Sequence, residues 1–229
     1  MKNHLKRIAT PSTWELNRKE NIFTVRPNSG AHGFEVGLPL GVIIRDMLDL
    51  ALTMNEAKKL LNNNTILVDG KRRKDHRFIV GLFDVLSFSE LKKYYRMTLN
   101  KKGKIVAIEI SEKESTIKPC KIVGKTILQK GRIQYNLHDG KNIISDKSAK
   151  VGDSFILTLP NLEINQVLPL KTGLTVFLMK GKNKGSVGLL KEIKDKEVVY
   201  VTDGKEIETT KKYLFVIGDK EISVQVKKK

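Results

Sequence analysis

The positions of apolar residues in the first third of the chain have the spacing of two amphipathic helices. The first helix is predicted to begin near Pro39, because proline fits the first turn of a helix. Its apolar face recurs at three- and four-residue intervals and consists of Ile44, Met47, Leu48 and Ala51. The second is predicted to begin at Thr53, whose hydroxyl caps the helix while Glu56 reaches back in a capping box.

Most of the remaining chain alternates apolar and polar residues or contains short apolar runs, both typical of β-strands. Residues 65–68 form a strand candidate that is closed by the turn pair Asp69-Gly70. The polar residues 100–104 separate two alternating stretches and predict a hairpin. Further candidates lie at residues 78–80, 84–88, 155–159, 175–179, 187–190, 198–202 and 214–217, and around Ile122, Ile127 and Ile133. Pro160 and Pro169 bracket a predicted linker.

These elements predict an α+β fold that is mostly β. Residues 1–36 contain scattered prolines and glycines without periodicity, and we interpret them as an extended arm that becomes ordered only against another surface. Residues 37–93 combine the two helices with a small sheet, and residues 94–170 form a central β domain. The closely spaced short strands of residues 171–229 predict a small barrel with a basic C-terminus.

The net charge narrows the class of partner. The 229 residues include 43 Lys and Arg against 25 Asp and Glu, which gives a formal charge of +18. The excess is present in all four segments, whereas a protein that binds a membrane surface more often concentrates its charge on one helix or one tail. Only the end of the chain resembles a tail, at Lys227, Lys228 and Lys229. Nucleic acid is therefore the expected partner, without a membrane contact or a small-molecule substrate.

The sequence also favours a cytoplasmic protein. The N-terminal residues lack the apolar core of a signal peptide, and no stretch reaches the length of a membrane-spanning helix. The single cysteine, Cys120, excludes an internal disulfide and a multi-cysteine zinc site, which fits a reducing compartment. We interpret its thiol as a small, partly buried side chain.

The densest group of cations follows the second helix. The turn Asp69-Gly70 leads into a basic run with one more arginine close behind it, and the members are Lys71, Arg72, Arg73, Lys74 and Arg77. A helix end and several cations beside one tight turn suit a phosphate backbone. The alternative is a solvated charged loop, since short basic runs are common on soluble surfaces.

A second group of cations lies in the Lys/Gly loop, residues 180–185, between two apolar strand candidates. Glycine lets the backbone make tight or left-handed turns and approach a partner closely. The cations of the loop, which would contact phosphates, are Lys180, Lys182 and Lys184. The alternative is an ordinary hairpin turn of a small barrel.

Together these segments resemble known families. The helix pair with residues 68–74 and 80–86 resembles the S-four-type RNA-binding domain, and residues 176–188 resemble a KOW motif. The whole chain is similar to the archaeal and eukaryotic small-subunit ribosomal protein family S-four-e. The matching segments include His4-Leu5-Lys6-Arg7, Val25-Arg26-Pro27, Leu38-Pro39-Leu40, Tyr95-Arg96, residues 136–143 and Gly152-Asp153-Ser154.

The resemblance implies a structural constituent of the small ribosomal subunit that acts in translation and is bound to ribosomes in the cytoplasm. It implies small-subunit ribosomal RNA and neighbouring small-subunit proteins as partners, with RNA contacts from the arm, the S-four-type domain and an SH3-like KOW barrel. The candidate RNA-binding residues are His4, Lys6, Arg7, Trp14, Arg18, Lys19, Arg26, Arg45, Lys58, Lys59, Lys71, Arg72, Arg73, Lys74, Arg77, Lys180, Lys182 and Lys184. Trp14 either stacks on a base or fills the space between the arm and the first domain.

No catalytic motif stands out, so we expect no catalysis, cofactor or metal. Gly124-Lys125-Thr126 resembles the end of a phosphate-binding loop, but Pro119 stands where that loop needs a glycine. The four histidines lack metal-ligand spacing, and His138-Asp139 is interpreted as part of a turn with Gly140. Two alternatives are an RNA-modifying enzyme with an S-four-type module, which needs a larger catalytic domain, and a KOW-bearing factor that visits RNA transiently.

Overall fold

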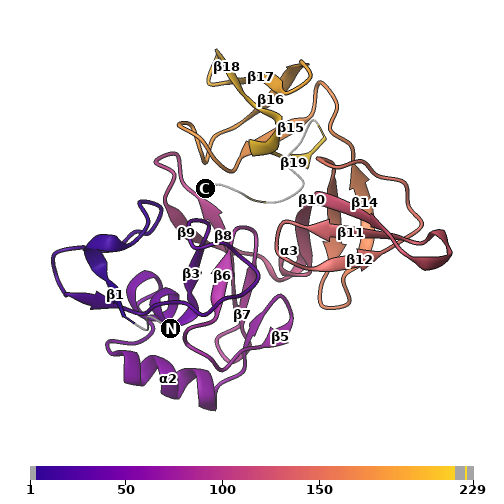
Figure 1. The fold of residues 1–229 in the computed structure, drawn as a ribbon. Helices are drawn as coiled ribbons and strands as arrows, with labels where there is room; N and C mark the ends of the chain where they lie inside the picture. Colours follow the sequence, from indigo (N-terminus) through magenta and orange to yellow (C-terminus); the bar gives the residue numbers. More distant parts are fainter. Residues whose placement is uncertain (1–3, 220–224, 226–229) are drawn as a thin grey trace. The chain divides into compact units, whose positions relative to one another are not determined.

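The computed structural model describes residues 4–219 and residue 225, so the predicted lysine tail at 227–229 lies outside the described residues. The chain forms two compact units (Figure 1). Unit 1 contains the described residues up to Thr98 together with Lys104–Ser115. Unit 2 contains Leu99–Gly103 and the described residues from Thr116 onward. A five-residue turn, Leu99–Gly103, therefore packs with the second half of the chain.

The first predicted helix is present but shorter than expected. It begins as α1 (Leu40–Val42) and continues as a π-helical segment, η2 (Ile43–Met47). The Leu48 N–H donates to the Ile43 carbonyl at 3.0 Å, a wide π-type bond that loosens the last turn. Asp49 then adopts a positive φ of 51°, which takes the chain out of the helix before the predicted end at Ala51.

Helix α2 (Met54–Asn63) begins at the predicted capping box, which the structure confirms. The Thr53 hydroxyl accepts a hydrogen bond from the Glu56 N–H at 3.2 Å, and the Thr53 N–H donates to the Glu56 carboxylate at 3.4 Å. These two bonds pair N–H groups that a helix start leaves without intrahelical acceptors. The helix buries Ala57 and Leu61, so its opposite face lies in solvent.

Unit 1 contains a five-stranded antiparallel sheet in addition to its helices (Figure 1). Its strands in spatial order are β5 (Lys71–Arg72), β4 (Ile66–Val68), β7 (Val85–Phe88), β8 (Lys93–Leu99) and β9 (Ile105–Ile110). Asp69 and Gly70 form the predicted turn between β4 and β5, with φ angles of 50° and 75° that suit a tight hairpin. The remaining elements are η1 (Arg7–Ala9), α3 (Glu112–Ser115), and the pairs β1 (Leu5–Lys6) with β2 (Phe23–Thr24) and β3 (Gly37–Pro39) with β6 (Ile79–Gly81).

The N-terminal arm packs against the rest of unit 1. Trp14 is fully buried, and its indole N–H donates to the Phe34 carbonyl at 3.3 Å. His32 Nε2 lies 2.9 Å from the Asp84 carboxylate, which also accepts from the Gly81 N–H. A buried tryptophan and a buried His–Asp pair tie the arm to the domain, so the surface against which these residues pack is unit 1 itself.

Unit 2 contains two five-stranded antiparallel sheets. The first consists of β12 (Asn142–Ile144), β11 (Ile133–Leu137), β10 (Ile117–Ile127), β13 (Ser154–Thr158) and β14 (Glu163–Leu168). Strand β14 lies between Pro160 and Pro169 and pairs with β13, so the predicted linker was wrong. Ile164 and Val167 of β14 pack on a buried cluster, which explains why this stretch forms a strand.

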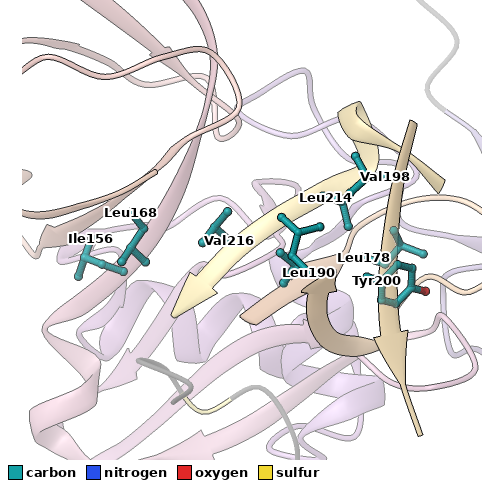
Figure 2. Close-up of a cluster of buried hydrophobic side chains, with 9 residues drawn as sticks. Ile156, Leu168, Leu178, Leu190, Val198, Tyr200, Leu214 and Val216 are labelled. Atoms are coloured by element: carbon teal, nitrogen blue, oxygen red, sulfur yellow. The ribbon is translucent and has the colours of Figure 1, made fainter. Parts of the chain in front are cut away.

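The second sheet of unit 2 shares a core with the first. Its strands are β18 (Lys205–Thr210), β17 (Glu197–Thr202), β16 (Val187–Ile193), β15 (Thr175–Leu178) and β19 (Leu214–Gly218), and short 3₁₀ turns lie at η3 (Gln129–Gly131) and η4 (Lys211–Tyr213). Ile156 and Leu168 of the first sheet join a cluster with Val216 of the second (Figure 2). Both units consist mainly of strands, which confirms the predicted α+β, mostly β class.

A buried lysine adds to this shared core. Lys121 on β10 donates from its Nζ to the carbonyls of Lys212 and Leu214, where β19 begins. Burial lowers the pKa of Lys121 to about 8, because desolvation penalises its charged form. These bonds tether the first sheet of unit 2 to the second.

Candidate nucleic-acid interface

The strongest group of exposed cations in unit 1 lies on helix α2 and on the β4–β5 turn. Because α2 turns Ala57 and Leu61 inward, Lys58 and Lys59 are exposed on its outer side. After the tight turn, the exposed cations are Lys71, Arg72 and Lys74. The structure therefore presents one helix and one turn with cations at their surfaces, as the sequence predicted for this segment.

Three arginines near this turn also hold the fold together. Arg72 Nη2 donates to the Asn62 carbonyl at the end of α2, at 3.1 Å. The Arg73 guanidinium lies 4.3 Å from the centroid of the Phe78 ring, a cation–π contact. Arg77 Nε donates to the Arg26 carbonyl at 3.0 Å, which joins the arm to the domain. Lys71 and Lys74 are thus better probes of binding than these arginines.

His76 lies in the same region, although the sequence did not indicate it as a candidate. Burial, followed by the positive charge of Lys58, lowers its pKa, while Asp75 acts in the opposite direction and Arg77 lowers it further. The histidine therefore stands within the group of cations formed by α2 and the loop after β5. Its position directly after Asp75 in the basic run was the only signal in the sequence, and it is a weak one.

The arm contributes a smaller set of cations. His4, Lys6 and Lys19 are exposed, and Arg18 and Arg26 are partly buried. The Arg18 guanidinium donates to the carbonyls of Ile8 and Pro11 at 3.3 and 3.1 Å, so it also shapes the arm. The arm thus offers scattered cations rather than one dense group.

Arg7 and Arg45 are both paired with acidic groups of the protein itself. Arg7 is 3% exposed, and its Nη1 donates to the Asn17 carbonyl at 2.8 Å and lies 3.2 Å from the Glu20 carboxylate. Arg45 pairs with its neighbour Asp46 at 2.7 Å. Both line a hollow of about 630 Å³ whose carboxylates are Glu15, Glu20, Asp46 and Asp49. Lys104 is the third cation of this lining, so the four carboxylates exceed the cations by one and the hollow does not favour a phosphate.

Trp14 does not present a ring for stacking. Its exposed fraction is 0%, and its ring lies 5.2 Å from the centroid of the Phe34 ring. Of the two alternatives that the sequence left open, the structure favours packing between arm and domain.

In unit 2, the Lys/Gly loop carries the second group of cations. Lys180 and Lys182 are exposed, and Lys184 is partly buried. Gly181 and Gly185 have φ angles of 94° and 88°, in the left-handed region that favours glycine. The loop therefore has the conformation that the sequence suggested, with two of its three lysines open to solvent.

His138 and Asp139 lie in the predicted turn and form part of a buried charged cluster. The Asp139 carboxylate lies 2.8 Å from Lys118 Nζ and 3.3 Å from Lys141 Nζ. Burial alone would raise the pKa of Asp139, but the positive charges of Lys118, His138 and Lys141 overcome it and hold the pKa below its ordinary value. Lys118 and Asp139 are both almost fully buried, so their ion pair is a structural element.

One group of potential metal ligands overlaps this cluster. Ligand atoms of Cys120, His138 and Asp139 lie within 4.8 Å of one another. The Lys118 ammonium already binds the Asp139 carboxylate and neutralises its charge, so the donor set fits an ion pair better than a metal ion. The Cys120 thiol is buried, in agreement with its predicted environment.

Within residues 4–219, no helix combines the length and the apolar character needed to cross a membrane. The longest helix, α2, has ten residues and a charged outer face.

Two family models match the sequence. Residues 91–164 match the model described as ribosomal family S4e, which is the S-four-e family of the sequence resemblance. Residues 1–35 match the model of the RS4NT (NUC023) domain. The two matches cover the arm and a large part of the middle of the chain.

Individual relatives match almost the full length. The small ribosomal subunit protein eS4 of Methanocella arvoryzae is 41% identical, with 97% of each chain covered. The eS4 protein of Methanocaldococcus jannaschii is 40% identical, with 96% of each covered. The crystal structure of the 30S ribosomal protein S4e from Thermoplasma acidophilum is similar with a TM-score of 0.69 and 30% identity, covering 80% of this chain and 95% of that one. The chain therefore belongs to the ribosomal protein family S4e.

Proposed function

We propose that this protein is a non-catalytic, structural constituent of the small ribosomal subunit, where it binds small-subunit ribosomal RNA. Its full-length relatives are named small ribosomal subunit protein eS4, which supports this role in translation. The net charge of +18 supports a polyanionic partner. In this proposal the protein resides on cytoplasmic ribosomes and also contacts neighbouring small-subunit proteins.

The binding mechanism is electrostatic and geometric. Lysine and arginine side chains neutralise RNA phosphates and release condensed counterions, and the fold fixes where those side chains stand. We assign the contacts to the arm (residues 1–36), the S-four-type domain (37–93) and the KOW module with its SH3-like fold (171–229), with the central domain (94–170) between them. Arg7 and Trp14 are buried and Arg45 is paired with Asp46, so we assign no RNA contact to these three residues.

The observation that carries the proposal is the exposed cationic surface formed by α2 and the β4–β5 turn. The β4–β5 hairpin pairs Lys71 with Val68 and Arg72 with Leu67. The Arg72 guanidinium in turn donates to the Asn62 carbonyl at the end of α2. Arg72 thus contacts the same helix, α2, that exposes Lys58 and Lys59. The fold thus fixes the backbone positions of these cations before a phosphate backbone binds.

We expect Lys71→Gln/Lys74→Gln to weaken RNA binding without unfolding the protein, because both side chains are exposed. Each lost phosphate contact lowers the slope of log affinity against log salt by about 1, so the double variant should lower it by about 2. The measurement is fluorescence anisotropy with a labelled small-subunit RNA fragment over a salt series.

Lys92→Gln/Lys93→Gln is the matched control, because these two lysines are also exposed in unit 1 but lie at the start of β8. The control should retain nearly the wild-type slope. An equal loss in both variants would mean that affinity follows net charge alone, and this would contradict the assigned surface.

A further inference from the structure

The turn between β8 and β9 touches the Lys/Gly loop within unit 2. Asn100 shapes this turn: its carbonyl accepts from the Gly103 N–H at 2.8 Å, and its side-chain oxygen accepts from the Lys102 N–H at 3.0 Å. A Cβ at Gly185 would lie 2.9 Å from the carbonyl carbon of Asn100 and would overlap with its oxygen. The turn backbone therefore meets the Lys/Gly loop where only glycine fits.

Two further contacts fix the turn in place. Gly103 lies on the aliphatic part of Lys184, because a Cβ added at Gly103 would be 2.5 Å from Lys184 Cγ. Lys101 Nζ lies 3.1 Å from the carboxylate of Asp203, which stands in the turn between β17 and β18. The β8–β9 turn thus contacts both the Lys/Gly loop and the β17–β18 turn.

These contacts occur at one end of the C-terminal sheet. The Thr202 hydroxyl donates to the Val187 carbonyl at 2.8 Å, so the β17–β18 turn lies beside the residues that follow the Lys/Gly loop. Strand β16 then leads away from this end, and the next turn, with Lys194 and Lys196, lies beyond its far end. The β8–β9 turn therefore contacts one end of the C-terminal sheet, and the turn with Lys194 and Lys196 lies at the opposite end.

The docked turn concentrates positive charge. Lys101 and Lys102 are exposed on the turn, and Lys180 and Lys182 are exposed on the loop. The ion pair of Lys101 with Asp203 is 67% and 74% exposed, so it contributes little to stability and leaves the lysine available to a stronger anion. Bringing like charges together is unfavourable in the free protein but favourable beside a polyanion.

We propose that the β8–β9 turn and the Lys/Gly loop form one RNA-binding surface, in which Lys101 and Lys102 bind the phosphodiester backbone together with Lys180 and Lys182. This inference rests on the proposed RNA binding and adds a segment from the middle of the sequence to the C-terminal site. Gly185 and Gly103 act indirectly, because their missing side chains let the turn and the loop approach closely.

The direct test is Lys101→Gln/Lys102→Gln against the control Lys194→Gln/Lys196→Gln. Both variants remove two exposed lysines from a turn of unit 2, so they change the net charge equally. The probe is a short labelled RNA duplex, and its affinity is measured over a salt series. Lys101→Gln/Lys102→Gln should lower the slope of log affinity against log salt by about 2 and weaken binding at least about tenfold near 0.1 M salt. Lys194→Gln/Lys196→Gln should change neither the slope nor the affinity strongly.

The outcomes separate the two claims. If the wild-type protein itself shows no salt-dependent RNA binding, the proposed function fails. If the wild type binds and Lys101→Gln/Lys102→Gln behaves like the control, the composite surface is overturned while the proposed function stands. Thermal melting of both variants checks that each has folded, which is expected because all four side chains are exposed.

Lysine labelling gives an independent answer on the unmodified protein. An amine-reactive reagent with mass-spectrometric detection should show that saturating RNA protects Lys101, Lys102 and Lys182 together, while Lys194 and Lys196 stay reactive. Equal reactivity of Lys101 and Lys194 in the presence of RNA would overturn the proposal.

Discussion

Replacing Asp139 with Ala is expected to destabilise unit 2 by about 3–5 kcal/mol, because it removes one charge of a buried ion pair with the Lys118 ammonium. Lys118 is 0% exposed and its Nζ lies 2.8 Å from the Asp139 carboxylate. The measurement is urea unfolding followed by circular dichroism at neutral pH. Since the folded-state pKa of Asp139 lies below its ordinary value of 3.8, the stabilisation is complete above that pH and is lost as the pH falls below it.

The control removes both charges at once. Lys118→Met/Asp139→Leu removes both charges of this pair and should cost less than Asp139→Ala, since apolar replacements of a buried pair are often nearly neutral. If the single and double variants lose equal stability, the loss comes from packing or from the Lys141 contact, and the ion-pair account of the turn at His138-Asp139 is wrong.

RNA affinity is expected to fall by roughly three to five decades between about 50 and 200 mM salt, if about six to ten phosphates are contacted. The exposed cations of α2, the β4–β5 turn, the arm and the Lys/Gly loop are numerous enough for this number of contacts. The measurement is a salt series with naked small-subunit RNA and the whole chain.

A shallow salt response would contradict this electrostatic mechanism. A slope that corresponds to one or two contacts would mean that most of the exposed lysines and arginines do not meet phosphates. The same salt series with Lys58→Gln/Lys59→Gln tests α2, where both lysines are exposed. A lower slope than that of the wild type would show that these two lysines contact phosphates.

Local patterns in the sequence predicted much of the fold. The capping box at Thr53 and the turn at Asp69-Gly70 both formed as expected, because hydrogen bonds between near neighbours determine them. The predicted linker rests only on the two flanking prolines, Pro160 and Pro169, and the residues between them instead form strand β14. Only its pairing with β13 and its packing on the core of unit 2 make it a strand.

The candidate site was less predictable, because exposure depends on tertiary contacts. Arg7 and Lys6 are neighbours in a basic segment, yet Arg7 is buried and contacts Asn17 and Glu20, while Lys6 is exposed. The role of Gly185 was likewise hidden, since its close neighbour Asn100 is far away in the sequence. A composition or a motif indicates which residue types favour RNA, but it does not show which of them reach the surface.

Sedimentation of cell lysate through a sucrose gradient in moderately high salt tests the central claim most directly. The protein is followed with an antibody across the free, small-subunit, large-subunit and whole-ribosome fractions. A structural constituent should remain on small subunits and whole ribosomes at one copy per subunit. A mainly free pool would contradict this account and would favour a factor that visits RNA transiently.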